Sequence, residues 1–194
     1  MQRVTVYCAS STRLPDAWYT AAATIGTAIG QAGLELVYGG GSIGLMGAVA
    51  EAAKAAGARV HGIITTKLLA MEQGWDGCDE LEVVETMQQR RRRLLDLADG
   101  LVVLPGGLGT MEEFFEALVG RQLGDHGTPI VLVDIEGGLT PVTQMLDALM
   151  AMQLVRASIR TLYGVTADPS EAVAMLRSMP GGTVDPDQFV PSGS

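Results

Sequence analysis

Two adjacent carboxylates, Glu112 and Glu113, follow the glycine-rich turn in the stretch LPGGLGTMEEF at positions 104–114. Where such a turn opens a helix, its backbone N–H groups and the positive helix end suit a phosphate or a ribose oxygen. Carboxylates beside a bound phosphate can act as general bases or stabilise developing positive charge. The N–H groups that we expect at this site belong to Gly107, Leu108, Gly109 and Thr110.

The same residues also have an interpretation that needs no chemistry. Thr110 and Glu113 have the T-x-x-E spacing of a capping box, in which the glutamate reaches back to the threonine amide at the start of a helix. A capping box does not require the second glutamate, Glu112. Spacing alone leaves both interpretations open.

Four consecutive arginines at positions 90–93 provide the matching positive charge. A helix turns by about 100° per residue, so its apolar residues define one side. These apolar residues are Met87, Leu94, Leu95, Leu97 and Ala98. Arg90 and Arg91 fall on that side and need anionic partners, for which Glu112, Glu113 and a bound phosphate are candidates. Arg92 and Arg93 point away from it and are expected to be surface charges.

A second glycine-rich turn lies in the stretch VYGGGSIGLMG at positions 37–47, where Gly39, Gly41 and Gly44 match G-x-G-x-x-G. The match alone is a weak sign of a dinucleotide site, because the next strand offers no carboxylate for the ribose. A tight turn for helix–sheet packing is a second interpretation. The third is a mononucleotide or sugar-phosphate contact, for which Gly40 and Gly41 are our candidates.

The elements that must position these residues alternate between strand and helix. Apolar runs rich in Val, Ile and Leu predict strands at 3–8, 34–38, 58–64, 81–85, 100–105, 129–135 and 161–166. Helices are predicted at about 15–32, 44–56, 86–98, 110–123, 140–152 and 169–178. The order predicts one Rossmann-like α/β domain, a doubly wound and mostly parallel sheet with helices on both faces. Ligands bind such sheets at the carboxyl ends of the strands, where the segments 8–12, 39–44, 105–109 and Arg90 would converge.

The domain is expected to span residues 1–180, followed by a flexible Pro-, Gly- and Ser-rich tail at 181–194. The segment 65–80 has no clear period and predicts a loop or short helix near the site. A chain of 194 residues with 47% hydrophobic content can bury a full core.

Composition narrows the classes of partner. The net charge of −9 argues against nonspecific nucleic-acid binding, and no apolar run is long enough for a membrane span. The N-terminus looks like a first strand and not a signal peptide. Cys8 and Cys78 form neither a CxxC pair nor a ligand cluster, so a cytoplasmic location is the simplest expectation.

These residues together carry a family resemblance. The chain resembles the Lonely Guy family of cytokinin riboside 5'-monophosphate phosphoribohydrolases, often mislabelled as lysine decarboxylases. The family signature PGGxGTxxE is complete from Pro105 to Glu113, and its upstream M-x-x-R-K corresponds to Met87, Arg90 and Arg91. The turn at 37–47 and the opening YCASS are also similar, and the resemblance covers about residues 3–165.

The resemblance implies hydrolysis of the N-glycosidic bond of a nucleoside 5'-monophosphate, AMP or an N6-substituted AMP, to free base and ribose 5-phosphate. It implies that Arg90 and Glu113 are the catalytic pair. It further implies a homodimer with sites near the interface, no cofactor and no metal. The substrate-binding residues that it implies are Glu72, Arg91 and the stretch from Gly107 to Glu112.

Breaking a glycosidic bond develops oxocarbenium charge on the ribose. Glu113 could stabilise this charge or activate the attacking water. Arg90 would hold the phosphate or orient Glu113, and the sequence does not choose between these roles.

Departures from the family pattern concern base specificity. Arg91 stands where the family has a lysine, Gln88 where it often has a histidine, and Val119 where plant members have a threonine. The family's IPK is replaced by ITT at 64–66.

The main rival function is a nucleotide or molybdenum-cofactor carrier of the same architecture. Decarboxylation with pyridoxal phosphate is disfavoured, because Lys54 and Lys67 are the only lysines and Lys54 has a surface pattern.

Overall fold

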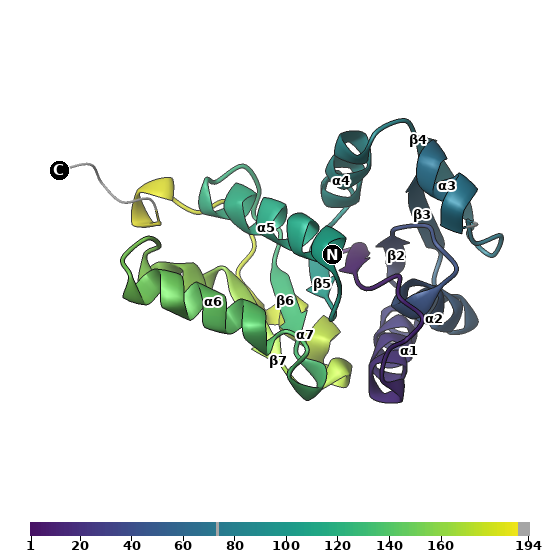
Figure 1. The fold of residues 1–194 in the computed structure, drawn as a ribbon, viewed down its shortest axis with the longest axis horizontal. Helices are drawn as coiled ribbons and strands as arrows, with labels where there is room; N and C mark the ends of the chain where they lie inside the picture. The colour runs from purple at the N-terminus through teal and green to yellow at the C-terminus, as the bar shows by residue number, and fades with distance from the viewer. Residues whose placement is uncertain (73, 190–194) are drawn as a thin grey trace.

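The computed structural model describes residues 1–72 and 74–189, apart from the side chain of Glu72. Its centre is a seven-stranded sheet in the order β4-β3-β2-β1-β5-β6-β7, and every pair of neighbouring strands is parallel (Figure 1). The strands are β1 (Arg3–Tyr7), β2 (Glu35–Tyr38), β3 (Val60–Thr65), β4 (Glu80–Val84), β5 (Gly100–Val103), β6 (Ile130–Val133) and β7 (Tyr163–Thr166). Each predicted strand is found within two residues of its expected bounds. The apolar runs indicated strands correctly because the central strands are buried on both faces.

Helices cover both faces of the sheet (Figure 1). One face packs against α1 (Asp16–Gln31), α2 (Gly44–Ala55) and α7 (Ala172–Ser178). The other packs against α4 (Met87–Asp96), α5 (Leu108–Gln122) and α6 (Thr140–Ala151). The two apolar clusters on either side of the sheet make this a three-layer domain, which confirms the predicted fold class.

The strand order reverses between β1 and β5. From β1 the chain adds β2, β3 and β4 on one side, and it then returns to place β5, β6 and β7 on the other. The loops that follow β1 and β5 are held together by the bond from the Ala9 amide to the Pro105 carbonyl, at 3.2 Å. Such a reversal opens a crevice beyond the carboxyl ends of the two strands, where doubly wound proteins bind ligands.

The segment 65–80 agrees with one of its two predicted forms, a short helix, whereas the last predicted helix differs in detail. The segment 65–80 contains a short helix, α3 (Thr66–Glu72), whose first turn is capped by the Thr65 hydroxyl, which accepts from the Leu68 amide at 3.1 Å. The predicted helix at 169–178 begins as a 3₁₀ turn, η3 (Pro169–Glu171), and continues as α7.

The C-terminal segment is described as far as Phe189, and residues 190–194 lie outside the described part. The buried Phe189 ring packs on the α5 side of the sheet, and its carbonyl accepts from the Gln122 side chain at 3.2 Å. None of the helices in the described ranges is long and apolar enough to cross a membrane.

Candidate active site

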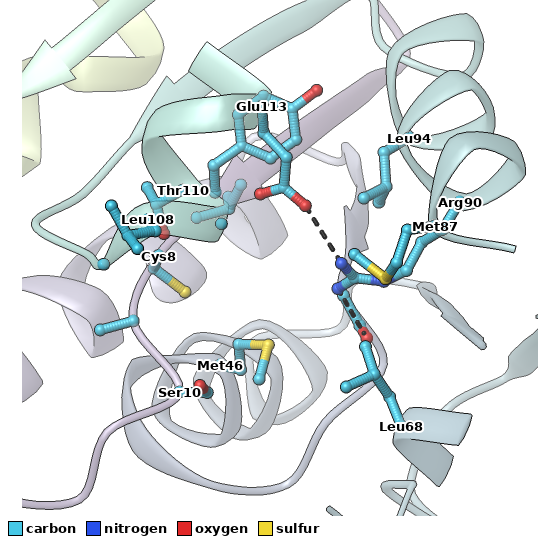
Figure 2. A pocket seen from close by; sticks show the side chains of 16 residues that line it. Cys8, Ser10, Met46, Leu68, Met87, Arg90, Leu94, Leu108, Thr110 and Glu113 are labelled. Atoms are coloured by element: carbon cyan, nitrogen blue, oxygen red, sulfur yellow. Dashed lines mark hydrogen bonds and ion pairs between the residues drawn. The ribbon is translucent and has the colours of Figure 1, made fainter. Parts of the chain in front are cut away.

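A cavity of about 290 Å³ lies at the switch point between β1 and β5 (Figure 2). Its walls come from four places far apart in the sequence: the end of β1, the glycine turn after β2, helix α4 and the start of α5. Leu68 of α3 and Met46 of α2 complete the lining. The topology alone therefore brings both glycine-rich turns and the arginine helix to one hollow.

Arg90 and Glu113 meet at the wall of this cavity. Nη1 of Arg90 donates to Oε1 of Glu113 at 3.1 Å, and each side chain is only 9% exposed (Figure 2). Oε2 of Glu113 makes no hydrogen bond within the described residues and lies on the side of Cys8 and Leu108 in Figure 2. One carboxylate oxygen is thus fixed by the arginine, and the other is available to a molecule in the cavity.

The guanidinium of Arg90 is fixed on its remaining sides by backbone. Nε donates to the Ile63 carbonyl at 2.9 Å, and Nη2 donates to the Gly39 carbonyl at 3.2 Å. A buried arginine is costly unless its N–H groups are paired. Here two carbonyls and one carboxylate pair it and hold it in a single orientation.

Gly39 leaves the space that Arg90 occupies. A Cβ built on Gly39 would lie 2.2 Å from Nη2 of Arg90 and 3.0 Å from Sδ of Met46. Glycine is therefore required here for close approach and not for an unusual backbone angle.

We expect Gly39→Ala to displace the guanidinium and lower turnover of a nucleotide substrate by about 10²-fold, because catalytic groups are sensitive to misplacement of about 1 Å. Steady-state kinetics and a thermal melt on the same sample measure the effect. Gly181→Ala is the control, since Gly181 has no atom within 4 Å of its added Cβ. Unchanged turnover in Gly39→Ala would contradict the fixed position of Arg90.

Helix α4 owes its start to a capping box. The Thr86 hydroxyl accepts from the Gln89 amide at 3.1 Å, and the Gln89 side chain accepts from the Thr86 amide at 3.1 Å. The helix then begins at Met87, and Arg90 and the buried Leu94 lie one turn apart on its inward side. The T-x-x-Q spacing at 86–89 could have revealed this cap in the sequence.

Helix α5 begins two residues earlier than predicted, at Leu108, with Gly107 as its N-cap. Thr110 therefore lies inside the first turn, buried against Gly106, and does not cap the helix. The capping-box interpretation of Thr110 and Glu113 is wrong. Glu113 lies further into α5, where its side chain turns to Arg90.

Burial dominates the electrostatics of Glu113. Loss of solvent raises the pKa of this carboxyl to about 7, and the nearby charge of Arg90 opposes the rise. Glu112 and Glu116 raise the pKa further, whereas Arg91 lowers it. A carboxyl with a pKa near neutrality can exchange a proton under ordinary conditions, which suits a general base.

The end of β1 adds two titratable groups: Cys8, which belongs to the segment 8–12 expected at this edge, and Tyr7, which the sequence did not indicate. Burial raises the pKa of the Tyr7 phenol well above its usual range, and Glu113 and Glu116 add to the rise. Burial also raises the pKa of the Cys8 thiol, again with a contribution from Glu113. Both groups therefore line the cavity in their protonated forms near neutral pH.

The predicted binding residues fall into three groups, with Glu72 apart from them. Gly107, Leu108, Gly109 and Thr110 all line the cavity, and Leu108 as a whole residue is 90% exposed. Arg91 and Glu112 pair with each other at 2.9 Å and are outside the lining.

Gly40 and Gly41 form the third group and also lie outside the lining. Gly40, at φ 77°, packs on Ile63 and Ile64, and Gly41 bridges to Gly74. Glu72 ends α3, and its side chain lies outside the described residues.

The two outer arginines differ from each other. Arg92 pairs with Asp96 of its own helix at 2.8 Å and is 69% exposed, as expected of a surface charge. Arg93 instead donates to both oxygens of Glu82 on β4, at 2.8 and 3.1 Å. The expectation of a simple surface charge was incomplete for Arg93, because the helix-face pattern did not take the neighbouring edge strand into account.

Comparison with known proteins gives three results. The profile of the family described as "possible lysine decarboxylase" matches residues 46–176. Cytokinin riboside 5'-monophosphate phosphoribohydrolases are 41% identical over 147 residues in Mycobacterium tuberculosis (76% of this chain, 78% of that protein) and 36% identical over 176 residues in Rhodococcoides fascians (90% and 89%). Among solved structures, the molybdenum cofactor carrier protein of Chlamydomonas reinhardtii has a TM-score of 0.72 at 22% identity, covering 92% of this chain and 97% of that one. The last likeness concerns the fold alone.

Proposed function

This chain belongs to the family of cytokinin riboside 5'-monophosphate phosphoribohydrolases, and from that premise we propose how its cavity works. The protein is a hydrolase that cleaves the N-glycosidic bond of a nucleoside 5'-monophosphate. The observation that carries the proposal is the buried Arg90–Glu113 pair in the wall of a cavity at the sheet's switch point.

In the proposed complex, the ribose lies against Glu113 and the phosphate lies at the turn that opens α5. Gly107 and Gly109 have no atom within 4 Å of an added Cβ, so the backbone there is open to close approach by a ligand. N–H groups in the first turn of a helix have no partner within the helix and suit a phosphate oxygen. This arrangement orients the substrate with its anomeric carbon toward the free oxygen of Glu113.

In the reaction that we propose, the bond between the anomeric carbon and the base nitrogen breaks, and its electron pair leaves with the base. Glu113, as the carboxylate, stabilises the positive charge on the ribose and accepts a proton from the attacking water. The oxygen of that water bonds to the anomeric carbon to give ribose 5-phosphate. A proton returned to the departing base restores the carboxylate.

For Arg90 we propose the orienting role. Three N–H groups of its guanidinium already bond to Ile63, Gly39 and Glu113. A group held this way is suited to fixing the carboxylate and less suited to reaching a phosphate. The pairing of this side chain therefore supports the orienting role of Arg90 over a phosphate-binding role.

This mechanism predicts a pH dependence. Since burial raises the pKa of Glu113 to about 7 and the reaction requires its carboxylate, kcat/KM should rise with pH through about 7. Below about pH 6 the rate should fall by roughly tenfold per pH unit, as expected for one essential base. Initial rates with AMP between pH 5 and 9 measure the profile. A flat profile through this range would contradict the assigned role.

The direct test of the function is product identification. Purified protein incubated with AMP or N6-isopentenyl-AMP should release the free base and ribose 5-phosphate, which chromatography separates from the nucleotide. A carrier protein would bind either nucleotide and leave it intact. The rates of base release from the two nucleotides show whether adenine or N6-substituted adenine is the preferred base.

We also propose a homodimer. Only Leu146 is buried among the residues of α6, whereas Met145 and, just beyond the helix, Met152 and Leu154 are exposed. Exposed apolar side chains clustered on one element are typical of a contact surface. Light scattering during size exclusion should give about twice the chain mass of 20.3 kDa. A monomer at micromolar concentration would contradict this proposal.

A cytoplasmic location is our proposal for the compartment. Cys8 and Cys78 are both free thiols in the structure, which fits a reducing environment. Fractionation of cells expressing the tagged chain tests it, and recovery outside the cytoplasmic fraction would contradict it.

A further inference from the structure

Arg91 follows the catalytic arginine on α4, yet its side chain pairs with residues that lie outside the cavity lining. Nη1 lies 2.9 Å from Oε1 of Glu112, and Nε donates to Oε2 of Glu116 at 2.7 Å. The Arg91 side chain is 19% exposed. Glu112 and Glu116 are four residues apart and therefore share one face of α5.

These contacts tie α4 to α5 beside the Arg90–Glu113 pair. Arg90 bonds to Glu113, and Arg91 bonds to Glu112 and Glu116, which lie before and after Glu113 on α5. Two consecutive residues of α4 thus bind one turn of α5. Without the outer contacts, the bond between Arg90 and Glu113 would be the one polar contact between the two helices that remains in the described part of the chain.

We propose that Arg91 is a positioning residue, which clamps α4 to α5 and neutralises Glu112 and Glu116 beside the catalytic carboxylate. The inference rests on the proposed function and deepens it. It also departs from the substrate-binding role that the family resemblance implies for Arg91 and Glu112. The reason is geometric, because both side chains are outside the cavity lining and satisfy each other.

The clamp has an electrostatic consequence. The charged or titratable groups that face Glu113 are Arg90 and Arg91 from α4, Glu112 and Glu116 from α5, and Tyr7 and Cys8 from the end of β1. Arg91 lowers the pKa of Glu113, and both neighbouring glutamates raise it. Removing Arg91 therefore leaves two uncompensated negative charges beside Glu113, and its pKa should move further up.

The test compares Arg91→Met with Arg92→Met on the same helix. For Arg91→Met we expect kcat with AMP to fall roughly tenfold with KM changed by less than about twofold, because the catalytic pair is misplaced while the binding turn is intact. The acid limb of the pH profile should move to higher pH. Arg92→Met should match the parent, since the ion pair of Arg92 in the described part of the chain is with Asp96 of its own helix and not with α5. A tenfold higher KM at unchanged kcat would overturn the proposal in favour of substrate binding.

Two further variants keep the test decisive if Arg91→Met folds poorly. Arg91→Lys retains the charge, so it should keep the acid limb near the parental pH, but one ammonium cannot hold both glutamates as the guanidinium does, so kcat should stay lowered. Glu116→Gln removes a negative charge and should move the acid limb to lower pH. If the acid limb moved in the same direction in Arg91→Met and in Glu116→Gln, the proposed effect of these charges on the pKa of Glu113 would be overturned.

A readout without turnover separates this inference from the proposed function. Carbon-13 NMR of labelled glutamate carboxyls follows the titration of Glu113, whose signal is assigned by its loss in Glu113→Gln. The midpoint should be higher in Arg91→Met than in the parent even if the parent does not cleave AMP. An equal midpoint in a parent that does cleave AMP would overturn the inference and leave the function standing.

Discussion

Replacing Glu113 with glutamine is expected to lower kcat by about 10³-fold, within the range that a positioned acid–base group contributes. The glutamine side chain has nearly the same shape and can still accept from Arg90 through its oxygen, but it carries no negative charge to stabilise the ribose or to accept a proton. The fold should persist, because Gly107 and not Glu113 provides the cap of α5. Kinetics with AMP, together with circular dichroism and a thermal melt, measure both parts.

Glu112→Gln is the matched control for this prediction. Glu112 precedes Glu113 on α5, but its side chain is 54% exposed and bonds to Arg91 instead of Arg90. The substitution removes one of the two contacts of Arg91, whereas Glu116 still holds that side chain, so turnover should fall by less than the roughly tenfold loss expected of Arg91→Met. Full activity in Glu113→Gln would show that the Glu113 carboxylate has no part in the mechanism. Equal losses in the two variants would show that turnover depends on the negative charge of α5 and not on the position of Glu113.

Replacing Arg90 with alanine is expected to lower kcat by about as much as Glu113→Gln does, and also to destabilise the protein. The substitution leaves Glu113 buried without its partner and frees the carbonyls of Ile63 and Gly39. Breaking a buried pair by removing one partner costs about 3–5 kcal/mol. Chemical denaturation measures the stability loss, and kinetics at a temperature well below the melting point measures the activity loss.

Arg93→Ala is the control on the same helix. Its bonds to Glu82 join α4 to the edge strand β4, and its side chain is outside the cavity lining. The partly exposed pair should be worth about 1 kcal/mol or less of stability, with turnover close to that of the parent. An Arg90→Ala variant with parental activity would end the proposed mechanism. Arg90→Lys should also be inactive, since one ammonium cannot reach three acceptors in three directions.

The fold was predictable because its signals are local. Short segments rich in Val, Ile and Leu predicted all seven strands, and the glycine turns after two of them indicated the edge where the cavity lies. The inward position of Arg90 was also predictable, because Leu94 lies one turn further on the same side of a regular helix.

The parts that were not predictable depend on contacts between distant segments. The start of α5 was placed at Thr110 because T-x-x-E resembles a cap, and nothing in the sequence indicates that Gly107 takes that place. The substrate-binding role of Arg91 is implied by the family resemblance alone. Helical periodicity gives the direction of its side chain, and Glu112 is confirmed as one of its candidate partners, but the second partner, Glu116, lies one turn further along α5 and was not predicted. The need for glycine at position 39 arises from a guanidinium that is 51 residues away in the chain.

The hydrogen bonds of the Arg90 guanidinium have a consequence for how the chain folds. Its partners lie just beyond β2, within β3 and within α5, so these three segments and α4 must dock before the carboxylate is held in place. No partly assembled form of the chain can hold that arrangement. During refolding, recovery of catalysis should therefore lag behind recovery of secondary structure and mark the arrival of the last segment.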